Sequence, residues 1–212
     1  NDNKLRYLLE NGQPSVATRI LSTWPNIAET AAVSGNFDYL EFSAEYAPFS
    51  QYDLENIPRA LEIHNVGSMI KVDFQNRGYV AQKAVASGFQ AVLFTDLRTA
   101  DEVRESICML RPETPKDGGR FGYPNRRWIG CRPYRSQMDY AAMLRKIVIA
   151  VMIEKAEAME NIEEICSIPG VDMVQFGPSD YSMSKGWNFK DHEEEVRQVE
   201  LEMIKVALKH NV

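Results

Sequence analysis

Six short apolar runs alternate with helical segments along the chain, and this alternation constrains the fold more than any other feature. The runs are rich in Val, Ile, Phe and Met. They mostly lack the polar–apolar alternation that a half-exposed strand shows, so both faces of each strand should be covered. The predicted strands are residues 15–20, 39–45, 68–73, 91–96, 147–154 and 173–178. Buried strands separated by helices predict a parallel α/β fold.

The segments between these runs carry the periodicity of helices. The predicted helices are residues 24–34, 52–63, 77–86, 99–110, 155–167 and 191–210. The last is the clearest, because its first turn is acidic, its last turn is basic and one face is apolar. That face consists of Val196, Val199, Met203, Ile204, Ala207 and Leu208.

Glycine punctuation favours a barrel over a doubly wound sheet. At Gly35, Gly88 and Gly170 a helix ends and a strand begins two or three residues later. No glycine-rich dinucleotide fingerprint follows the first strand. We therefore expect a (βα)8 TIM-type barrel as a single domain over residues 1–212. About six βα units are present, so either the last two are missing from this chain or the barrel is open.

Residues 111–146 interrupt the alternation with a long segment rich in Pro, Gly and basic residues. Loops of this length are usually functional or disordered. We interpret it as a loop excursion on the active-site face or at a subunit contact. Arg126 and Arg127 within it are candidates for binding a second, anionic substrate, and a solvated loop or subunit contact explains them equally well.

Composition excludes several classes of function. A net charge of −6 disfavours nucleic-acid binding, which needs clustered Lys and Arg. No apolar run approaches the roughly 20 residues of a membrane span, and no secretion signal is recognisable. Cys108, Cys131 and Cys166 match no zinc or redox spacing. The sequence thus predicts a cytoplasmic protein with reduced thiols, no nucleic-acid partner and no membrane partner.

Two acids stand at the carboxyl ends of consecutive apolar runs. Glu154 closes the fifth run and Asp180 closes the segment that begins at Met173. In an α/β barrel these ends share the catalytic face, where carboxylates hold a metal. The alternative is that each acid only caps the helix that follows it.

The surroundings of these acids carry a family resemblance. Ile153-Glu154, Gly170-Val-Asp172 and Phe176-Gly-Pro-Ser-Asp-Tyr-Ser182 are similar to motifs of the metal-dependent (class II) pyruvate aldolases of the HpcH/HpaI group. Further matches lie at residues 37–40, 45–48, 84–90, 99–102 and 119–122. The similarity runs from about Leu5 to the end of the chain.

The resemblance implies roles for the matching positions. Glu154 and Asp180 would ligate Mg²⁺ (or Mn²⁺, Co²⁺ or another divalent metal), and the ion would stabilise the enolate of a 2-oxo acid such as pyruvate or oxaloacetate. Backbone at Gly177, Pro178 and Ser179 would bind the substrate carboxylate at a helix start. Arg19, at the end of the first strand, would add charge for a dianionic substrate.

The chain also departs from the family pattern. Ser43-Ala-Glu-Tyr46 replaces Asp-Gly-Glu-His, so the His–Asp proton-handling dyad is absent. Lys71 replaces an Arg that clamps the oxo acid. The other departures are Met152 for Gln, Ala86 for an Asp contributed across a subunit contact, and Asp96 for an apolar residue.

These departures shape the predicted proton chemistry. Tyr46 and Lys71 become the candidate catalytic residues, with Lys71 also binding substrate. Tyr46 ordinarily titrates near 10, which suits a hydrogen-bond donor or acid better than a base. Simple packing is the alternative for Tyr46, and an ion pair with Glu45 or Asp96 is the alternative for Lys71.

The predicted function is a divalent-metal-dependent carbon–carbon lyase of aldolase type. Without the dyad, an oxaloacetate-type decarboxylase or a condensing synthase is the first alternative. The second is a non-catalytic binding homologue that keeps the metal pocket. The resemblance further implies a homo-oligomer, a trimer or hexamer.

Overall fold

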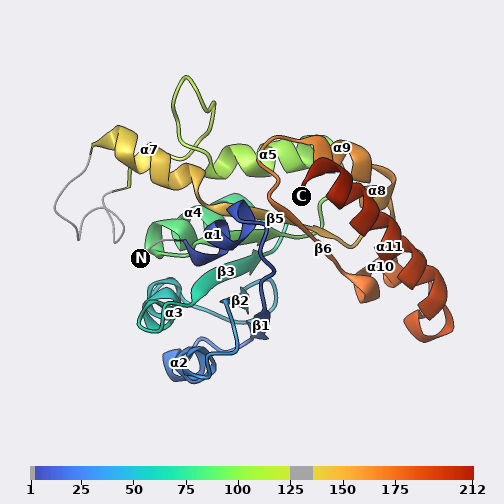
Figure 1. Cartoon of the computed structure of the whole chain (residues 1–212), viewed down its shortest axis with the longest axis horizontal. Helices are drawn as coiled ribbons and strands as arrows, with labels where there is room; N and C mark the ends of the chain where they lie inside the picture. Colours follow the sequence, from blue (N-terminus) through green and yellow to red (C-terminus); the bar gives the residue numbers. More distant parts are fainter. Residues whose placement is uncertain (1–2, 125–135) are drawn as a thin grey trace. The chain divides into compact units, whose positions relative to one another are not determined.

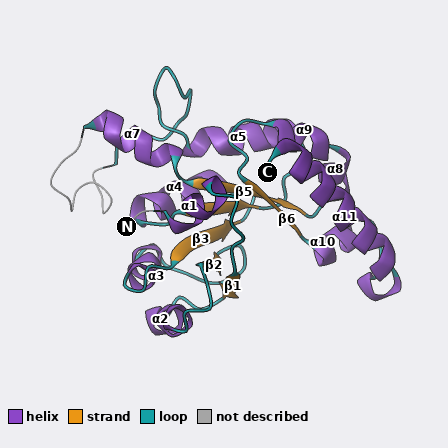
Figure 2. Ribbon diagram, in the orientation of Figure 1, coloured by secondary structure: helices purple, strands orange, loops and turns teal. Residues whose placement is uncertain are grey.

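The computed structural model describes residues 3–124 and 136–212, and their contacts group into two compact units. The first comprises residues 1–93 and 108–148, and the second comprises residues 94–107 and 149–212. The strands are hydrogen-bonded in chain order from β1 to β6, so neighbours in sequence are neighbours in the sheet. Figures 1 and 2 draw the helices and strands. The division between the units passes through two strands, β4 and β5, at their ends.

The first unit is built from repeated strand–helix pairs. It contains α1 (Lys4–Glu10), β1 (Ala17–Ile20), α2 (Pro25–Val33), β2 (Tyr39–Ser43), α3 (Asp53–Glu62), β3 (Gly67–Val72), α4 (Arg77–Ser87), most of β4 (Ala91–Phe94) and α7 (Gln137–Arg145). The strands β1, β2 and β3 pair in parallel, with Ala17 opposite Tyr39 and Tyr39 opposite Gly67. Helix α2 packs on α3, and α3 and α4 cover β3 (Figure 1).

The second unit continues the same pattern. It contains most of α5 (Ala100–Leu110) and of β5 (Val148–Ile153), then α8 (Ala156–Glu160), α9 (Ile162–Ser167), β6 (Met173–Phe176), α10 (Pro178–Ser184), a 3₁₀ turn (Phe189–Asp191) and α11 (Glu193–His210). Strands β5 and β6 are parallel, with Ala150 opposite Met173. Helix α11 packs against α9 and α10.

The predicted α/β class and all six strands are confirmed. Every residue of β2, β3 and β5 is buried, which explains why these runs lack polar alternation. The described residues hold six strands of a parallel sheet, and closure into the full eight-stranded barrel is not confirmed. The single-domain organisation stays a prediction.

The predicted strands extend too far at their carboxyl ends. The hydrogen-bonded strands stop at Ser43, Phe94, Ile153 and Phe176, one or two residues before the predicted ends. Apolar pattern identifies the covered part of a strand, but the chain turns out of the sheet where polar side chains begin. Those turning residues include Glu45, Asp96 and Glu154.

The structure differs from the predicted helices at four places, one of which is α10, expected only as a helix start near Ser179. The predicted helix 155–167 is two helices, α8 and α9, because Asn161 interrupts it and donates side-chain hydrogen bonds to the carbonyls of Arg98 and Glu157. Helix α1 was not predicted. Helix α7 lies inside the predicted loop excursion 111–146, where Ser136 and Asp139 form a reciprocal capping box.

The described residues also bear on the predictions about membrane spans and about the cysteines. No helix among them is both long enough and apolar enough to cross a membrane. Cys108 and Cys166 are free thiols, and burial raises the pKa of Cys166 to about 11, which suits an unreactive structural thiol. Cys131, Arg126 and Arg127 lie outside the described residues.

Candidate active site

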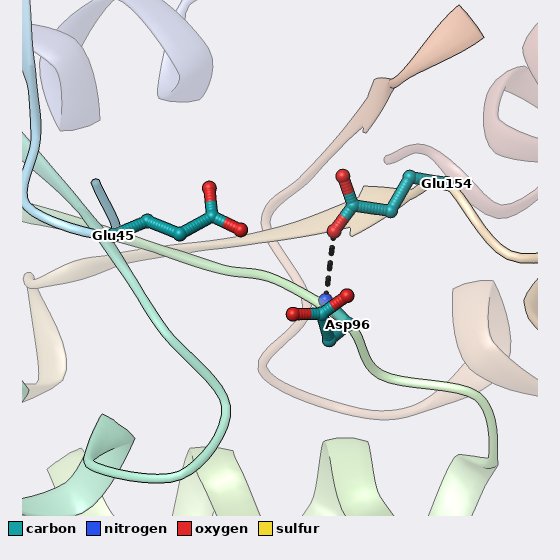
Figure 3. Close-up of side chains that lie close together, drawn as sticks. All are labelled: Glu45, Asp96 and Glu154. Atoms are coloured by element: carbon teal, nitrogen blue, oxygen red, sulfur yellow. Dashed lines mark hydrogen bonds between the residues drawn. The ribbon is translucent and has the colours of Figure 1, made fainter. Parts of the chain in front are cut away.

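Glu154 is the most deeply buried acid of the second unit, with 1% of its surface exposed. It follows β5 directly, and its Oε1 accepts a hydrogen bond from the backbone N–H of Asp96 at 2.8 Å (Figure 3). One carboxylate oxygen of Asp96 lies within 4.8 Å of one of Glu154. A buried carboxylate needs such partners, because removing its charge from water is costly.

Asp96 reaches this position through an unusual backbone conformation. Its φ is +58°, in the left-handed region that Asp tolerates better than most residues. This turn, two residues after β4, directs the Asp96 N–H onto Glu154. Strained backbone of this kind concentrates at functional sites, so the conformation supports a role for Asp96.

Lys155 brings a positive charge to the same acids. Its Nζ lies 2.6 Å from Oδ1 of Asp96, and its side chain is 15% exposed. Burial lowers the pKa of Lys155, but the hydrogen bond and charge of Asp96, with the charges of Glu154 and Asp180, more than offset it and leave the pKa raised. Lys155 is therefore a cation at neutral pH.

Gly177 packs directly on Glu154. A Cβ at this position would lie 2.7 Å from the Glu154 Cβ and 3.2 Å from its Oε2, so only glycine fits. The Gly177 N–H donates to the carbonyl of Ile153 at 3.0 Å, and Pro178 has no N–H. Of the predicted substrate-binding segment, Ser179 thus keeps the backbone N–H available at the start of α10.

Asp180 lies half-buried in the first turn of α10, near enough to Lys155 to affect its pKa. Glu154, Asp96 and Asp180 therefore all act on one lysine within the second unit. Carboxylate oxygens are the donors that Mg²⁺ and similar hard cations prefer. Carboxylate oxygens of Asp96 and Glu154 lie within 4.8 Å of one another, so their chemistry fits a divalent ion, and Asp180 as a ligand stays a prediction.

Lys71 lies in the first unit, buried in β3 with 3% exposure. Its Nζ forms an ion pair with Oε2 of Glu45, and the Glu45 N–H donates to the carbonyl of Lys71 at 3.1 Å. Oε2 of Glu45 has no aligned hydrogen bond from the described residues, so the contact is ionic. The expected ion pair of Lys71 with Glu45, the third acid drawn in Figure 3, is present, and the role of Lys71 in catalysis and substrate binding stays a prediction.

Tyr46 and Arg19, also in the first unit, are more exposed. The Tyr46 side chain is 73% exposed, with Nζ of Lys71 at 5.6 Å from its ring centroid. This distance lies within cation–π range, so the Lys71 ammonium group is attracted to the face of the Tyr46 ring. Arg19 donates from Nε to Glu41 at 2.8 Å, which means that its charge is already paired.

A cavity of about 390 Å³ lies elsewhere in the first unit. It is formed by one face of α4 and the segment around Phe121, and Ala86 lines it. None of the predicted site residues is among its lining residues. The cavity therefore lies apart from the acids. Open surface cavities are common in proteins without a catalytic role, whereas a buried carboxylate such as Glu154 is costly to keep.

Sequence reasoning singled out Glu154, Asp180 and the unusual Asp96, but not Lys155. A lysine at a strand-to-helix junction is common and carries no signal by itself. Only the contact with Asp96 across 59 positions of sequence marks it. The positioning of Glu154 by a backbone N–H was equally invisible, because it depends on φ at Asp96.

Comparison with known proteins identifies the family. A sequence model described as HpcH/HpaI aldolase/citrate lyase matches residues 20–212. The chain belongs to this family. Among curated relatives, it is 26% identical over 199 residues to the 2-keto-3-deoxy-L-rhamnonate aldolase of Escherichia coli O6:K15:H31, covering 93% of this chain and 72% of that protein. The resemblance found in the sequence motifs is thereby confirmed.

Several solved structures share the fold. An HpcH/HpaI aldolase/citrate lyase family protein from Burkholderia cenocepacia J2315 has a TM-score of 0.85 at 21% identity, covering 99% of this chain and 82% of that one. The citrate synthase SbnG has a TM-score of 0.82 at 22% identity, covering 98% of this chain and 78% of that one. The CitE protein of Mycobacterium tuberculosis, in complex with magnesium and acetoacetate, gives 0.54 at 12% identity, with 92% and 70% covered.

Proposed function

We propose that this HpcH/HpaI family member is a divalent-metal-dependent carbon–carbon lyase that acts on a 2-oxo acid. The observation that carries the proposal is the buried Glu154 carboxylate, oriented by the Asp96 N–H and closely packed by Gly177. Membership of an aldolase/lyase family supplies the reaction class. An aldolase among the curated relatives supports a small 2-oxo acid as substrate.

Glu154 and Asp180 are the residues that would hold the ion, Mg²⁺ or Mn²⁺ or Co²⁺. The magnesium and acetoacetate in the CitE complex support a divalent ion and a small oxo acid as the ligands, because the two occur together in a protein of related fold. When bound, such an ion supplies Lewis-acid stabilisation of the charge that develops on an enolate oxygen. Burial of Glu154 strengthens its electrostatic interaction with a cation.

The remaining roles fall to the chain's own groups. The Ser179 N–H, at the start of α10, is suited to a substrate carboxylate. Lys71 is a buried cation that would bind an anionic substrate group in addition to Glu45, with which it is already paired, and Tyr46 beside it is suited to donating a proton. Arg19 stays a predicted contributor of charge, reduced by its ion pair with Glu41.

The altered dyad favours a second candidate of the same chemistry. Ser43, which is buried, and Tyr46 stand where the resemblance expects Asp and His, so the Asp–His pair is absent from this turn. Retro-aldol cleavage needs a base that removes a hydroxyl proton, whereas decarboxylation forms the enolate by loss of CO₂, and condensation of that enolate needs a proton donor for the new alkoxide and no such base. Decarboxylation of an oxaloacetate-type acid, or condensation as a synthase, is therefore the alternative.

The deciding experiment is proton NMR of pyruvate in D₂O with the protein and Mg²⁺, beside an oxaloacetate decarboxylation assay. We expect metal-dependent loss of the methyl signal, abolished in Glu154→Gln and retained in Glu160→Gln, a matched change at an exposed acid. Tyr46→Phe and Lys71→Met should slow the exchange if they carry the proton. Decarboxylation without proton exchange would select the alternative. The absence of both activities would refute a catalytic role.

A further inference from the structure

Lys155 is placed where a divalent ion needs negative charge. Its Nζ contacts Oδ1 of Asp96, and the charges of Glu154 and Asp180 also act on it. Figure 3 shows Asp96 below Glu154, joined to it through the Asp96 N–H. One ammonium group and three carboxylates thus occupy one neighbourhood of the second unit. An ammonium cation and a divalent ion attract the same oxygens and repel each other.

We propose that Lys155 competes with the divalent ion for these carboxylates, with Asp96 as the carboxylate that the two share, so that Lys155 sets the affinity of the site. This deepens the proposed function and rests on it, since it presupposes that Glu154 and Asp180 hold the ion. Lys155 is a positioning residue in this role: it acts through Asp96 and need not touch substrate.

The backbone conformation of Asp96 allows its carboxylate to contact either Lys155 or the ion. Its left-handed φ fixes the N–H on Oε1 of Glu154, so the two acids are held together whichever cation the Asp96 carboxylate contacts. The Asp96 side chain is 34% exposed, against 15% for Lys155, which leaves the carboxylate room to change rotamer. Both partners come from short connections directly after strands, where side-chain movement disturbs little packing.

The test is Mn²⁺ binding measured by calorimetry on the intact chain without substrate. Lys155→Met should tighten binding by roughly tenfold or more, because a repelling charge is removed and Asp96 is released. Lys155→Arg keeps the charge and should bind within about twofold of the parent. Lys205→Met makes the same change in net charge at a 75%-exposed side chain and should leave binding unchanged.

Asp96→Asn provides a second test, since Asn also tolerates a positive φ and keeps the N–H to Glu154. We expect it to weaken Mn²⁺ binding several-fold by removing the shared carboxylate. In the double variant with Lys155→Met, the gain from losing Lys155 should shrink, because the two residues act on each other. Removing a lysine that had only a structural role would not increase the affinity for Mn²⁺.

The outcomes separate this inference from the proposed function. Loss of Mn²⁺ binding in Glu154→Gln with unchanged or weaker binding in Lys155→Met would overturn the inference and leave the function standing. Undiminished binding in Glu154→Gln would overturn both, because the ion would then lie elsewhere. Tighter binding in Lys155→Met and weaker binding in Asp96→Asn would support the competition.

Discussion

A single carboxylate, Glu154, shows how this chain keeps a charge inside the protein. Burying an isolated carboxylate costs several kcal/mol, so its partners must compensate. The Asp96 N–H holds one oxygen, and the cationic Lys155 lowers the electrostatic cost. Gly177 lets the chain pass closely enough to confine the side chain. Of the three, the close packing at Gly177 depends most on residue type, because any Cβ there would meet Glu154.

Gly177→Ala tests the close packing on Glu154. The added methyl would overlap the Glu154 Cβ and Oε2, so we expect a loss of about 1–3 kcal/mol in the free energy of unfolding and weaker Mn²⁺ binding. Urea unfolding and calorimetry measure the two effects. Gly122→Ala is the matched control, because a Cβ there meets nothing within 4 Å and stability should change by less than about 0.5 kcal/mol. Equal effects of both variants would contradict the prediction.

At the scale of elements, α11 shows where a helical pattern predicts too much. Among residues of the predicted apolar face, Val196, Met203 and Ala207 are buried, but Ile204 and Leu208 are 38% and 70% exposed. Val206, absent from the predicted face, is buried. The buried side of α11 is therefore rotated slightly about the helix axis from the predicted apolar face. Its contacts with α9, α10 and β6 decide which side is buried.

Met203→Ala and Leu208→Ala test this rotation. Met203 is 5% exposed, so truncation should leave a cavity and cost about 2–5 kcal/mol in the free energy of unfolding. Leu208→Ala should cost less than about 0.5 kcal/mol, although both residues belong to the predicted apolar face. Urea unfolding measures both, and a larger loss for Leu208 would show that the helix presents its other side.

The link between α7 and the preceding loop predicts a pH dependence. Arg145 donates from Nε and Nη2 to the two oxygens of Asp117, both at 2.7 Å. These bonds, helped by Thr114, hold the pKa of Asp117 at about 2, below its ordinary value of 3.8. Because the folded-state pKa is depressed, the pair stabilises the fold above about pH 4, and this contribution disappears as the pH falls toward 2.

Thermal unfolding of Asp117→Asn and the parent between pH 7 and pH 2 measures this contribution. The difference in melting temperature should be constant from pH 7 to about pH 4 and shrink below it. Glu202→Gln removes an exposed acid whose contact with Lys205 is 3.6 Å, and it should change stability little at any pH. A difference for Asp117→Asn that persisted at pH 2 would show that the ion pair is not its origin.

At the scale of the whole molecule, the comparisons show the family of the chain but not its assembly. The family match spans residues 20–212, whereas the described structure contains one copy of the chain. The trimer or hexamer implied by the resemblance stays a prediction. Light scattering after size exclusion should give a mass three or six times the 24.2 kDa of one chain. A mass of one chain at micromolar concentration would contradict it.

The sequence by itself determined the class of fold, the six strands and the position of Glu154 directly after a strand, whereas Asp180 lies in the first turn of α10. These follow from local pattern: covered strands read as continuous apolar runs, and the Gly-Pro-Ser-Asp motif is contiguous. Only the tertiary structure decided where the strands stop, which face of α11 is buried, and that Lys71 pairs with Glu45. It also decided that Asp96 and Lys155 meet beside Glu154. Such contacts join residues far apart in sequence and depend on single dihedral angles, so no periodicity records them.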